Sequence, residues 1–127
     1  MKLTKCEMEI MNVLWKENRP LSRGDILALS VDKTWKDNSI HILLNGMLRK
    51  GAIKEDGFAR SGKVWGRLYA PNITMDAYYA ENVFSKSEQS AVPQLFSALL
   101  QRPDVSPELI AELRAMLDKR EKEISQK

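Results

Sequence analysis

The order of apolar and polar positions along the chain predicts a protein built mainly from short amphipathic helices. Through most of the sequence, apolar residues recur at spacings of three and four, which places them on one face of an α-helix. Residues that can cap a helix precede four of these segments, at Thr4, Ser22, Thr74 and Ser106. These signals predict helices over residues 5–17, 23–31, 38–50, 75–87, 90–102 and 107–124.

One region has the pattern of β-structure instead. The segments AIKEDGF and KVWGRLYA flank ARSG, a turn signal that contains glycine, which predicts a hairpin with its turn at residues 59–62. Arg60, Lys63 and Arg67 lie at or near the expected tip. The order helix, helix, helix, hairpin is that of a winged helix-turn-helix, in which the helix before the hairpin enters the major groove.

The helix predicted over residues 38–50 has an unusual outer face. A solvated helix usually carries Lys and Glu there, but this face carries two short amides, a bare Ile and a Gly. Amides can pair with adenine edges, Ser with several bases, and an apolar side chain can contact a thymine methyl. Gly46 would let the helix backbone approach DNA closely. The candidates for base reading are Asn38, Ser39, His41, Ile42 and Asn45. The alternative is a face that packs on a partner helix or is only solvated.

The distribution of charge agrees with an anionic partner for the first half of the chain. The net charge is +3, but residues 1–70 carry 13 Lys/Arg and 8 Asp/Glu, whereas residues 71–127 carry 7 and 9. Nucleic acid is the obvious partner for such a basic half, although many neutral domains have an excess of this size. The candidates for phosphate contact are Arg49, Lys50, Arg60, Lys63 and Arg67.

The C-terminal helices carry more apolar surface than about 55 residues can bury alone, which favours a homodimer. The expected dimerisation residues are Leu95, Leu99, Leu109, Leu113, Met116, Leu117 and Ile124. The alternative is that these stripes only pack on the N-terminal domain. We therefore expect a DNA-binding domain over residues 1–71 and a helical dimerisation domain over 72–127. A two-fold dimer matches a palindromic site in double-stranded DNA.

Composition argues against several other classes of protein. With Cys6 as the sole cysteine and His41 as the sole histidine, an internal disulfide, a thiolate metal cage and a Cys–His nucleophile pair are excluded. No segment groups acids, a base and a nucleophile, so we expect neither an enzyme nor a cofactor. No apolar run approaches the roughly 20 residues that span a bilayer, and the first ten residues are charged throughout. We expect a cytoplasmic protein without membrane insertion.

Several sequence strings, in this order and spacing, resemble one family. LTKCEMEIMNVLW, DKTW, LRKGAIKED, VWGRLYAP and the closing SPELIAELRAMLDK are similar to the penicillinase-repressor family of bacterial transcription regulators, the BlaI/MecI/CopY group. The resemblance runs over nearly the whole chain. It implies a winged-helix N-terminal domain and a helical C-terminal dimerisation domain. It also implies repression of a resistance or metal-homeostasis operon through a palindromic promoter site.

The chain departs from the family's pattern around the third helix. Lys36 and Asp37 stand where members often have Ser and Pro, which moves the expected helix cap to Asp37. Asn38, His41 and Gly46 stand where members commonly have Lys, Arg and Arg. These differences remove three potential cationic contacts with DNA, and so they bear on the operator sequence and its affinity.

The resemblance also implies ways in which the repressor is released. In the β-lactam branch, proteolysis cuts an Asn–Phe bond between the C-terminal helices, and the corresponding position here is Ala98–Leu99, without the Asn. A membrane sensor protease is the partner that this implies. The copper branch ends in a Cys-rich tail that has no counterpart in this sequence, so we do not expect copper sensing by that route. The sequence thus favours a dimeric winged-helix repressor, and the rival hypothesis is a winged-helix module that recruits a protein through the same helix face.

Overall fold

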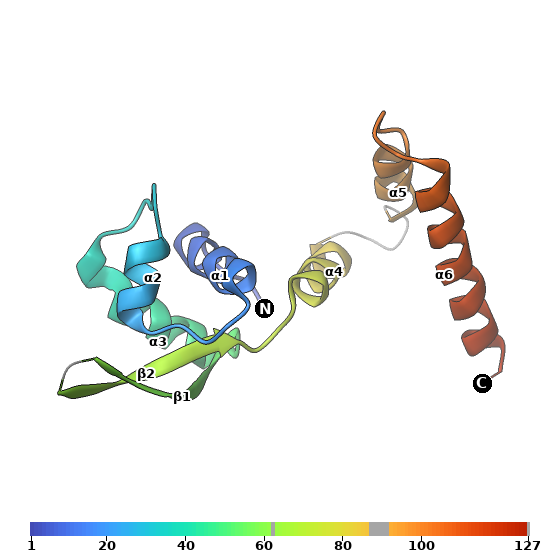
Figure 1. Cartoon of the computed structure of the whole chain (residues 1–127). Helices are drawn as coiled ribbons and strands as arrows, with labels where there is room; N and C mark the ends of the chain where they lie inside the picture. Colours follow the sequence, from blue (N-terminus) through green and yellow to red (C-terminus); the bar gives the residue numbers. More distant parts are fainter. Residues whose placement is uncertain (62, 87–91, 127) are drawn as a thin grey trace. The chain divides into compact units, whose positions relative to one another are not determined.

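The computed structural model describes residues 1–61, 63–86 and 92–126, and the chain divides into two compact units, Met1–Lys86 and Ser87–Lys127 (Figure 1). The first unit contains α1 (Lys5–Glu17), α2 (Arg23–Leu29), a 3-10 turn (Asp37–Ser39), α3 (Ile40–Lys50), β1 (Ile53–Ser61), β2 (Val64–Pro71) and α4 (Met75–Lys86). The second unit contains α5 (Val92–Leu100) and α6 (Pro107–Ser125). The fold is therefore mainly helical with one antiparallel hairpin, which confirms the predicted class.

The four predicted caps all begin helices. The backbone N–H of Glu7 donates to Thr4 Oγ1 at 3.3 Å, and the N–H of Thr4 donates back to Glu7 Oε1 at 2.9 Å, which completes a capping box. Ser22 forms the same box with Asp25. The hydroxyls of Thr74 and Ser106 each accept one backbone N–H at 3.1 Å. These side chains satisfy donors that a helix start leaves unpaired.

Two predicted boundaries near the helix-turn-helix are wrong. The second helix ends at Leu29 rather than 31, because Ser30 Oγ donates to the Ile26 carbonyl at 2.6 Å and Asp32 has a positive φ of 59°. Asp37 does not cap α3. It begins the 3-10 turn, where its carboxylate pairs with Lys33 at 2.6 Å, and α3 begins after Ser39 without a side-chain cap.

The core of the first unit lies between α1, α2, α3 and the base of the hairpin. Seven large side chains there are less than 2% exposed: Ile10, Met11, Leu14, Leu21, Ile26, Leu44 and Met47. Six of them lie on the inner sides of α1, α2 and α3, and Leu21 lies in the connection between α1 and α2. Trp35, in the connection before α3, joins the same cluster. Burial of α3's inner side thus fixes which of its residues face outward.

The hairpin turn lies further along the chain than predicted. Ala59 and Arg60, expected in the turn, belong to β1, where they pair with Gly66 and Trp65, and the last pair is Ser61 with Val64. The register shifts between Glu55 and Phe58, where Gly57 has a φ of 92°. This bulge places one extra residue in β1 relative to β2, and β1 continues through the residues that were predicted to form the turn.

The hairpin is anchored to the helices by backbone hydrogen bonds. Leu21, in the α1–α2 connection, donates to the Tyr69 carbonyl at 2.9 Å, and Tyr69 donates back to Leu21 at 2.8 Å. Leu21 and Tyr69 are both buried. The base of the hairpin is therefore fixed in the core, whereas the tip extends beyond it (Figure 1).

α4 packs on α1 within the first unit. Trp15 Nε1 donates to the Ile73 carbonyl at 3.0 Å, and the Trp15 ring lies 6.0 Å from that of Tyr78 between centroids. Tyr78 is buried, and its hydroxyl accepts the Leu3 N–H at 3.4 Å. The first compact unit thus continues to Lys86. The assignment of DNA binding to residues 1–71 and of dimerisation to residues 72–127 stays a prediction.

The second unit consists of α5 and α6, and neither helix has a buried residue. A groove of about 300 Å³ between them is lined mainly by apolar side chains: Phe96, Leu99, Leu100, Arg102, Asp104, Val105, Leu109 and Leu113. In the parts of the chain that the structure describes, no helix is long and apolar enough to cross a membrane.

Candidate nucleic-acid interface

The outer face of α3 carries the predicted base-reading side chains. Ile40, Leu44 and Met47 are buried on the inner side, which turns Ile42 and Asn45 outward. Ile42 is 73% exposed, although it is an aliphatic residue in the middle of a helix. Arg49 follows on the same face and is also exposed. An apolar group, an amide and a guanidinium thus share one accessible helix face.

The remaining base-reading candidates lie at the start of this helix. Asn38 and Ser39 precede α3 in the 3-10 turn, where Asn38 is exposed and Ser39 is half-buried. His41, in the first turn of α3, is exposed. Its ring nitrogens Nδ1 and Nε2 lie 2.7 and 2.5 Å from Arg23 Nη1. Because a guanidinium only donates, a ring nitrogen of His41 accepts this hydrogen bond.

Arg23 was missed by the sequence analysis. It is the first residue of α2, directly after the Ser22 cap, and its guanidinium contacts α3. The capping box already showed where α2 begins, so the position of Arg23 at a helix start could have been found. Its contact with His41 is not visible in the sequence, because the two residues are 18 positions apart. Arg23 adds a cation beside the outer face of α3.

Gly46 has a role inside the first unit that was not predicted. A Cβ at this position would lie 3.2 Å from Glu7 Oε2, so the glycine makes room for α1, and its approach to DNA stays a prediction. Glu7 is buried, and its carboxylate also accepts the Thr4 N–H. This contact could not be predicted because Glu7, which lies at the α1–α3 contact, is 39 positions away in the sequence.

Lys50 is held by the same buried carboxylate. Its Nζ lies 2.5 Å from Glu7 Oε1, which ties the end of α3 to the start of α1. Burial acts to raise the pKa of Glu7, but hydrogen bonds from Lys50 and Thr4 outweigh it, and the pKa lies below its ordinary value. The ammonium of Lys50 therefore has a buried carboxylate as its structural partner.

The cations of the hairpin are all accessible. Arg60, Lys63 and Arg67 are exposed. Arg67 Nη1 pairs with Glu55 Oε1 at 2.9 Å, an exposed ion pair that solvent weakens. The hairpin also exposes two large aromatic side chains that the sequence analysis did not single out, Phe58 and Trp65. The hairpin tip is thus both cationic and aromatic.

In the second unit, the predicted dimerisation residues lie on two helices. Leu95 and Leu99 lie on α5; Leu109, Leu113, Met116, Leu117 and Ile124 lie on α6. All are exposed except Leu113, which is half-buried. The possible cleavage site, Ala98–Leu99, is exposed in the last turns of α5.

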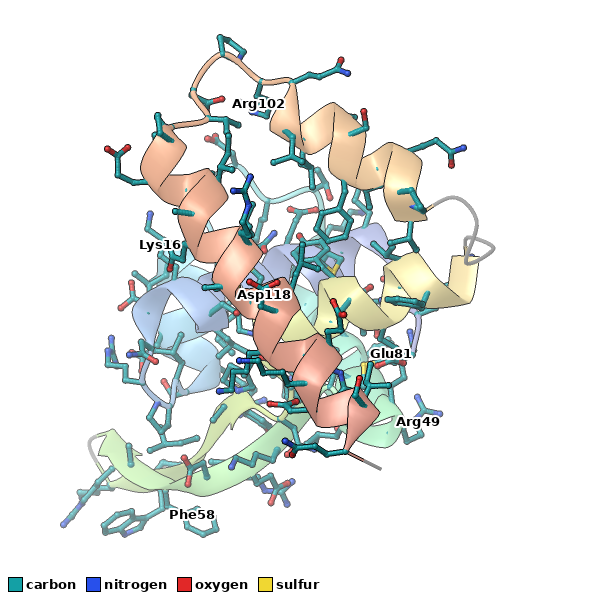
Figure 2. The ribbon with its side chains drawn as sticks, turned by 90° about the vertical axis from the view of Figure 1, so that its right-hand side faces the viewer. Lys16, Arg49, Phe58, Glu81, Arg102 and Asp118 are labelled. Carbon is teal, nitrogen blue, oxygen red and sulfur yellow. The ribbon has the colours of Figure 1, made fainter. Side chains whose placement is uncertain are left out.

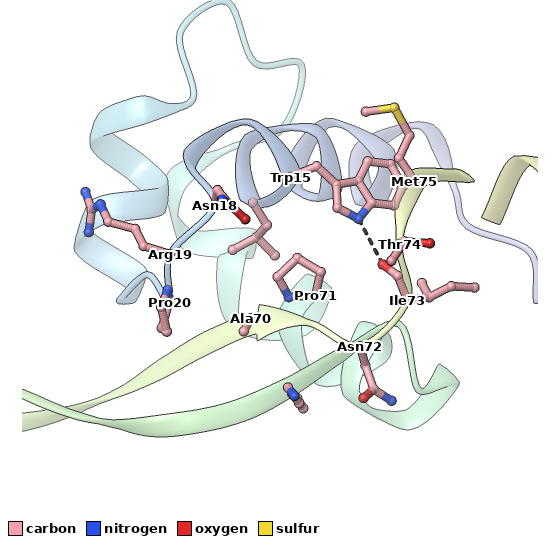
Figure 3. Close-up of a pocket in the computed structure, with 12 residues that line it drawn as sticks. Trp15, Asn18, Arg19, Pro20, Ala70, Pro71, Asn72, Ile73, Thr74 and Met75 are labelled. Atoms are coloured by element: carbon pink, nitrogen blue, oxygen red, sulfur yellow. Dashed lines mark hydrogen bonds between the residues drawn. The ribbon is translucent and has the colours of Figure 1, made fainter. Parts of the chain in front are cut away.

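The described residues were also compared with the requirements of a metal site and of a catalytic cavity. They contain no cluster of three or more His, Cys, Asp or Glu that could hold a metal ion. A cavity of about 550 Å³ lies between the end of α1, the end of β2 and the chain leading to α4 (Figure 3). Its lining consists of Leu14, Trp15, Asn18, Arg19, Pro20, Lys54, Ala70, Pro71, Asn72, Ile73, Thr74 and Met75. This lining includes no carboxylate, imidazole or thiol to act as a base or nucleophile.

The order of three helices and a cationic hairpin, with an accessible outer face on the third helix, is that of the winged helix-turn-helix class. The chain belongs to the penicillinase repressor family, whose model matches residues 3–119. This confirms the family that the sequence strings resemble, and it is a family of repressors rather than of enzymes.

Individual relatives match over almost their full length. The penicillinase repressor of Bacillus licheniformis is 26% identical over 120 residues, which cover 92% of this chain and 90% of the relative. The methicillin resistance regulatory protein MecI of Staphylococcus aureus (strain N315) is 23% identical over 121 residues, or 94% and 95% of the two chains. Among solved structures, the monomeric form of Bacillus licheniformis BlaI in complex with the blaP half-operator is 28% identical and has a TM-score of 0.44, covering 61% of this chain and 89% of that chain.

Proposed function

We propose that this protein is a transcriptional repressor that binds a palindromic promoter operator in the cytoplasm as a homodimer. The main observation behind the proposal is the orientation of α3. Ile42 and Asn45 are exposed on its outer face, and the opposite side is buried in the core. Relatives are named as a penicillinase repressor and a methicillin resistance regulator, which supports control of a β-lactam-resistance-type or related stress operon.

The residues of this face divide into two roles. Asn45 would pair with a base edge in the major groove, and Ile42 would contact a thymine methyl. Asn38, Ser39 and His41 lie at the end of α3 that enters the groove first in helix-turn-helix proteins. Arg23, Arg49, Arg60, Lys63 and Arg67 would contact phosphates, which sets register without reading sequence. Lys50 is left out of this set because Glu7 holds its ammonium.

The second unit supplies the pairing of two copies. α5 and α6 expose Leu95, Leu99 and Leu117 among other apolar side chains, and a second copy of the same surface would cover them. Two linked α3 helices then bind two half-sites, and the second binding event becomes intramolecular. This is how a dimer gains affinity for a palindrome over a single half-site.

Release would follow from separating the pairing helices from the DNA-binding unit. A cut between Ala98 and Leu99, in the exposed end of α5, would detach α6 from the rest of the chain. The repressor would then lose the linkage between half-sites rather than its recognition helix. A membrane sensor protease is the partner that would make this cut.

A second function uses the same α3 face for a protein partner. It is favoured by the exposed Ile42 and by the uncharged groups at Asn38 and Gly46, where a DNA-binding helix often carries cations. Contacts with phosphates release counterions, so DNA binding must weaken steeply as salt is added. Binding to a protein through Ile42 would be much less sensitive to salt.

The experiment that tests the proposed function compares two duplexes at one fixed salt concentration. One duplex is selected by the full-length protein from a random-sequence pool, and the other is a scramble of the same composition. We expect Asn45→Ala to cost about 1–3 kcal/mol on the selected duplex and to leave binding to the scramble nearly intact. Ile42→Ser should act in the same way but more weakly. Fluorescence anisotropy measures both affinities.

Matched controls use an exposed amide and an exposed aliphatic residue outside α3. Asn12→Ala on α1 and Val31→Ser in the α2–α3 connection should leave both affinities unchanged. A thermal melt of each variant separates lost folding from lost contacts. Equal losses on both duplexes with an unchanged melt would show that α3 does not read bases.

A further inference from the structure

The cavity between the end of α1, the end of β2 and the chain leading to α4 has no role in the function proposed above (Figure 3). Its volume of about 550 Å³ lies within the range of sites that hold small organic molecules, about 300–1,000 Å³. None of its lining residues belongs to α3, the helix whose outer face is proposed to read bases. A molecule in this cavity would therefore be bound apart from DNA.

The less exposed part of the lining, which we call the floor, is apolar. Leu14 and Ala70 are buried, and Trp15, Pro71 and Ile73 are half-buried. The indole N–H of Trp15 already donates to the Ile73 carbonyl at 3.0 Å, the bond drawn as a dashed line in Figure 3. Trp15 therefore offers the cavity an apolar ring rather than a hydrogen-bond donor. Aromatic molecules pack well on such rings, so the floor suits the apolar body of a ligand.

The exposed part of the lining, which we call the rim, is mainly polar. Among the lining residues that the structure describes, only Arg19 and Lys54 carry a formal charge, and both are cations. The Asn18 amide and the Thr74 hydroxyl are also exposed there, and both groups can donate hydrogen bonds to an anion. The rim thus suits a negatively charged group.

Lys54 is better placed than Arg19 to hold this anion. Lys54 pairs across the hairpin with the buried Ala70, and cross-strand partners lie on one face of a sheet. Within the described part of the chain, Lys54 has no acidic partner. Arg19 pairs with Glu17 at 3.7 Å and with Asp25 at 3.8 Å. Figure 3 shows its guanidinium pointing away from the rest of the lining.

We propose that this cavity binds a small aromatic carboxylate. The ring system would lie on the floor against Trp15 and Pro71, and the carboxylate would pair with the Lys54 ammonium at the rim. Ligand sites of this kind combine a mainly apolar lining with a few polar groups that fix orientation. A compact inorganic anion would leave the apolar floor uncovered, and a neutral aromatic molecule would leave the ammonium unpaired. The proposal goes beyond the proposed function, because it requires no DNA.

An occupant of this site would join α1 to the start of α4. Trp15 belongs to α1, and Met75 is the first residue of α4. Asn72, on the rim, donates from Nδ2 to the Gly51 carbonyl at 3.1 Å, which ties the same segment to the end of α3. A molecule that contacts both Trp15 and Met75 binds only while α4 stays packed on α1. Its binding should therefore raise the melting temperature of the protein.

Nuclear magnetic resonance of the full-length protein measures the binding, with 2-naphthoate as the probe and no DNA present. The three tryptophans give three indole N–H signals, which single Trp-to-Phe substitutions assign. The Trp15 signal should shift and saturate with a dissociation constant of about 1 mM or below, as expected for a ligand of this size. The signals of Trp35, in the core, and of Trp65, on β2, should stay unchanged. A Trp15 signal that does not move would overturn the proposal.

Two further probes separate the contribution of the charge from that of the rings. 2-Naphthamide has the same rings without the charge and should bind several-fold more weakly. Inorganic phosphate has charge without rings and should leave the Trp15 signal in place. Equal affinity for 2-naphthoate and 2-naphthamide, or an equal shift with phosphate, would contradict the assignment to an aromatic carboxylate. Shifts confined to α5 and α6 would place the binding on the exposed apolar side chains of the second unit and would also overturn it.

Substitutions locate the carboxylate and the rings. Lys54→Gln should weaken binding of 2-naphthoate several-fold and leave binding of 2-naphthamide unchanged. Lys16→Gln is the matched control, because Lys16 is exposed on α1 next to Trp15 but lies outside the lining (Figure 2). Ala70→Leu should fill the cavity and abolish the Trp15 shift, and a thermal melt shows whether this variant is folded. Wild-type affinity for 2-naphthoate in Lys54→Gln, or in a folded Ala70→Leu, would refute the proposed site.

Discussion

The two compact units differ in how completely they bury their apolar side chains. In Met1–Lys86, each of α1, α2 and α3 has a large side chain with zero exposure, at Ile10, Ile26 and Met47 respectively. In α5 and α6, no residue is buried, and Leu117 is 67% exposed. The first unit completes a core within one chain. The second unit is also rich in apolar residues, but none of those on α5 and α6 is buried within a single chain.

This difference in packing bears on the proposed function of each unit. A helix whose inner side is fully packed can present its outer side at a fixed orientation, which base reading requires. A pair of helices that leaves apolar surface uncovered favours association, because burial of that surface is the main driving force. The difference therefore supports the proposal that the first unit recognises DNA and that the second unit joins two copies.

The largest expected effect is on assembly. Leu113→Glu together with Leu117→Glu would place two charges in a dry interface, at a cost of several kcal/mol. Because the first unit has its own core, the variant should remain folded, and sedimentation velocity should show a monomer with much weaker operator binding.

Ala111→Glu with Ala115→Glu is the matched control, since these positions lie one turn apart on another side of α6. This control should remain dimeric. A dimer in the leucine variant would move the interface away from α6, with α4 and α5 as the next candidates.

The next effect concerns the contact that orients α3 inside the first unit. The pKa of Glu7 is lowered in the folded protein, so its contribution to stability is present above its unfolded pKa and is lost as pH falls through the folded pKa. Lys50→Met removes the main hydrogen bond that lowers this pKa. We expect it to cost about 2 kcal/mol near neutral pH and to reduce the loss of stability on acidification.

Chemical denaturation between pH 3 and pH 7, in roughly one-unit steps, measures this dependence. Lys54→Met, at an exposed position on β1, should leave the acid profile unchanged. If the pH dependence of stability were the same in Lys50→Met as in the wild type, Lys50 would not be what lowers the pKa of Glu7.

The smallest effect is at the hairpin tip. Lys63 is exposed, so Lys63→Ala should weaken binding to all duplexes about equally and reduce the salt slope by roughly one unit. Anisotropy titrations at four salt concentrations measure the slope. Lys16→Ala, on α1, is the control, and a wild-type slope in Lys63→Ala would remove this residue from the interface.

Local signals predicted most of the fold. Thr4, Ser22 and Ser106 begin helices because the hydroxyl of each accepts the backbone N–H of the residue three positions later. Both partners of such a bond are close together in the sequence, so the pattern can be recognised there. The period of apolar residues likewise placed the inner side of α3 correctly. The hairpin was found, but β1 continues to Ser61, through residues that were predicted to form the turn, and composition does not reveal the register shift between Glu55 and Phe58.

The contacts at the candidate site that were not predicted have a different origin. Gly46 and Lys50 both face Glu7, which lies some 40 positions earlier in the sequence. Arg23 was missed for the same reason, since only the folded chain brings it to His41. Long-range pairs of polar residues have no periodicity, so the sequence gives no sign of them. The outward position of Asn45 and Ile42 depends only on helix geometry, which explains why this prediction was correct.

The most direct test of this division of roles is a comparison of one half-site with two. Anisotropy at fixed salt would measure the full-length protein and the Leu113→Glu, Leu117→Glu variant on duplexes with a single or a paired copy of the selected half-site. The wild type should bind the paired duplex more than about a hundredfold more tightly than the single one. The variant should bind both with the wild type's single-site affinity. A variant that keeps the paired-site gain, or that loses single-site binding while folded, would contradict the account.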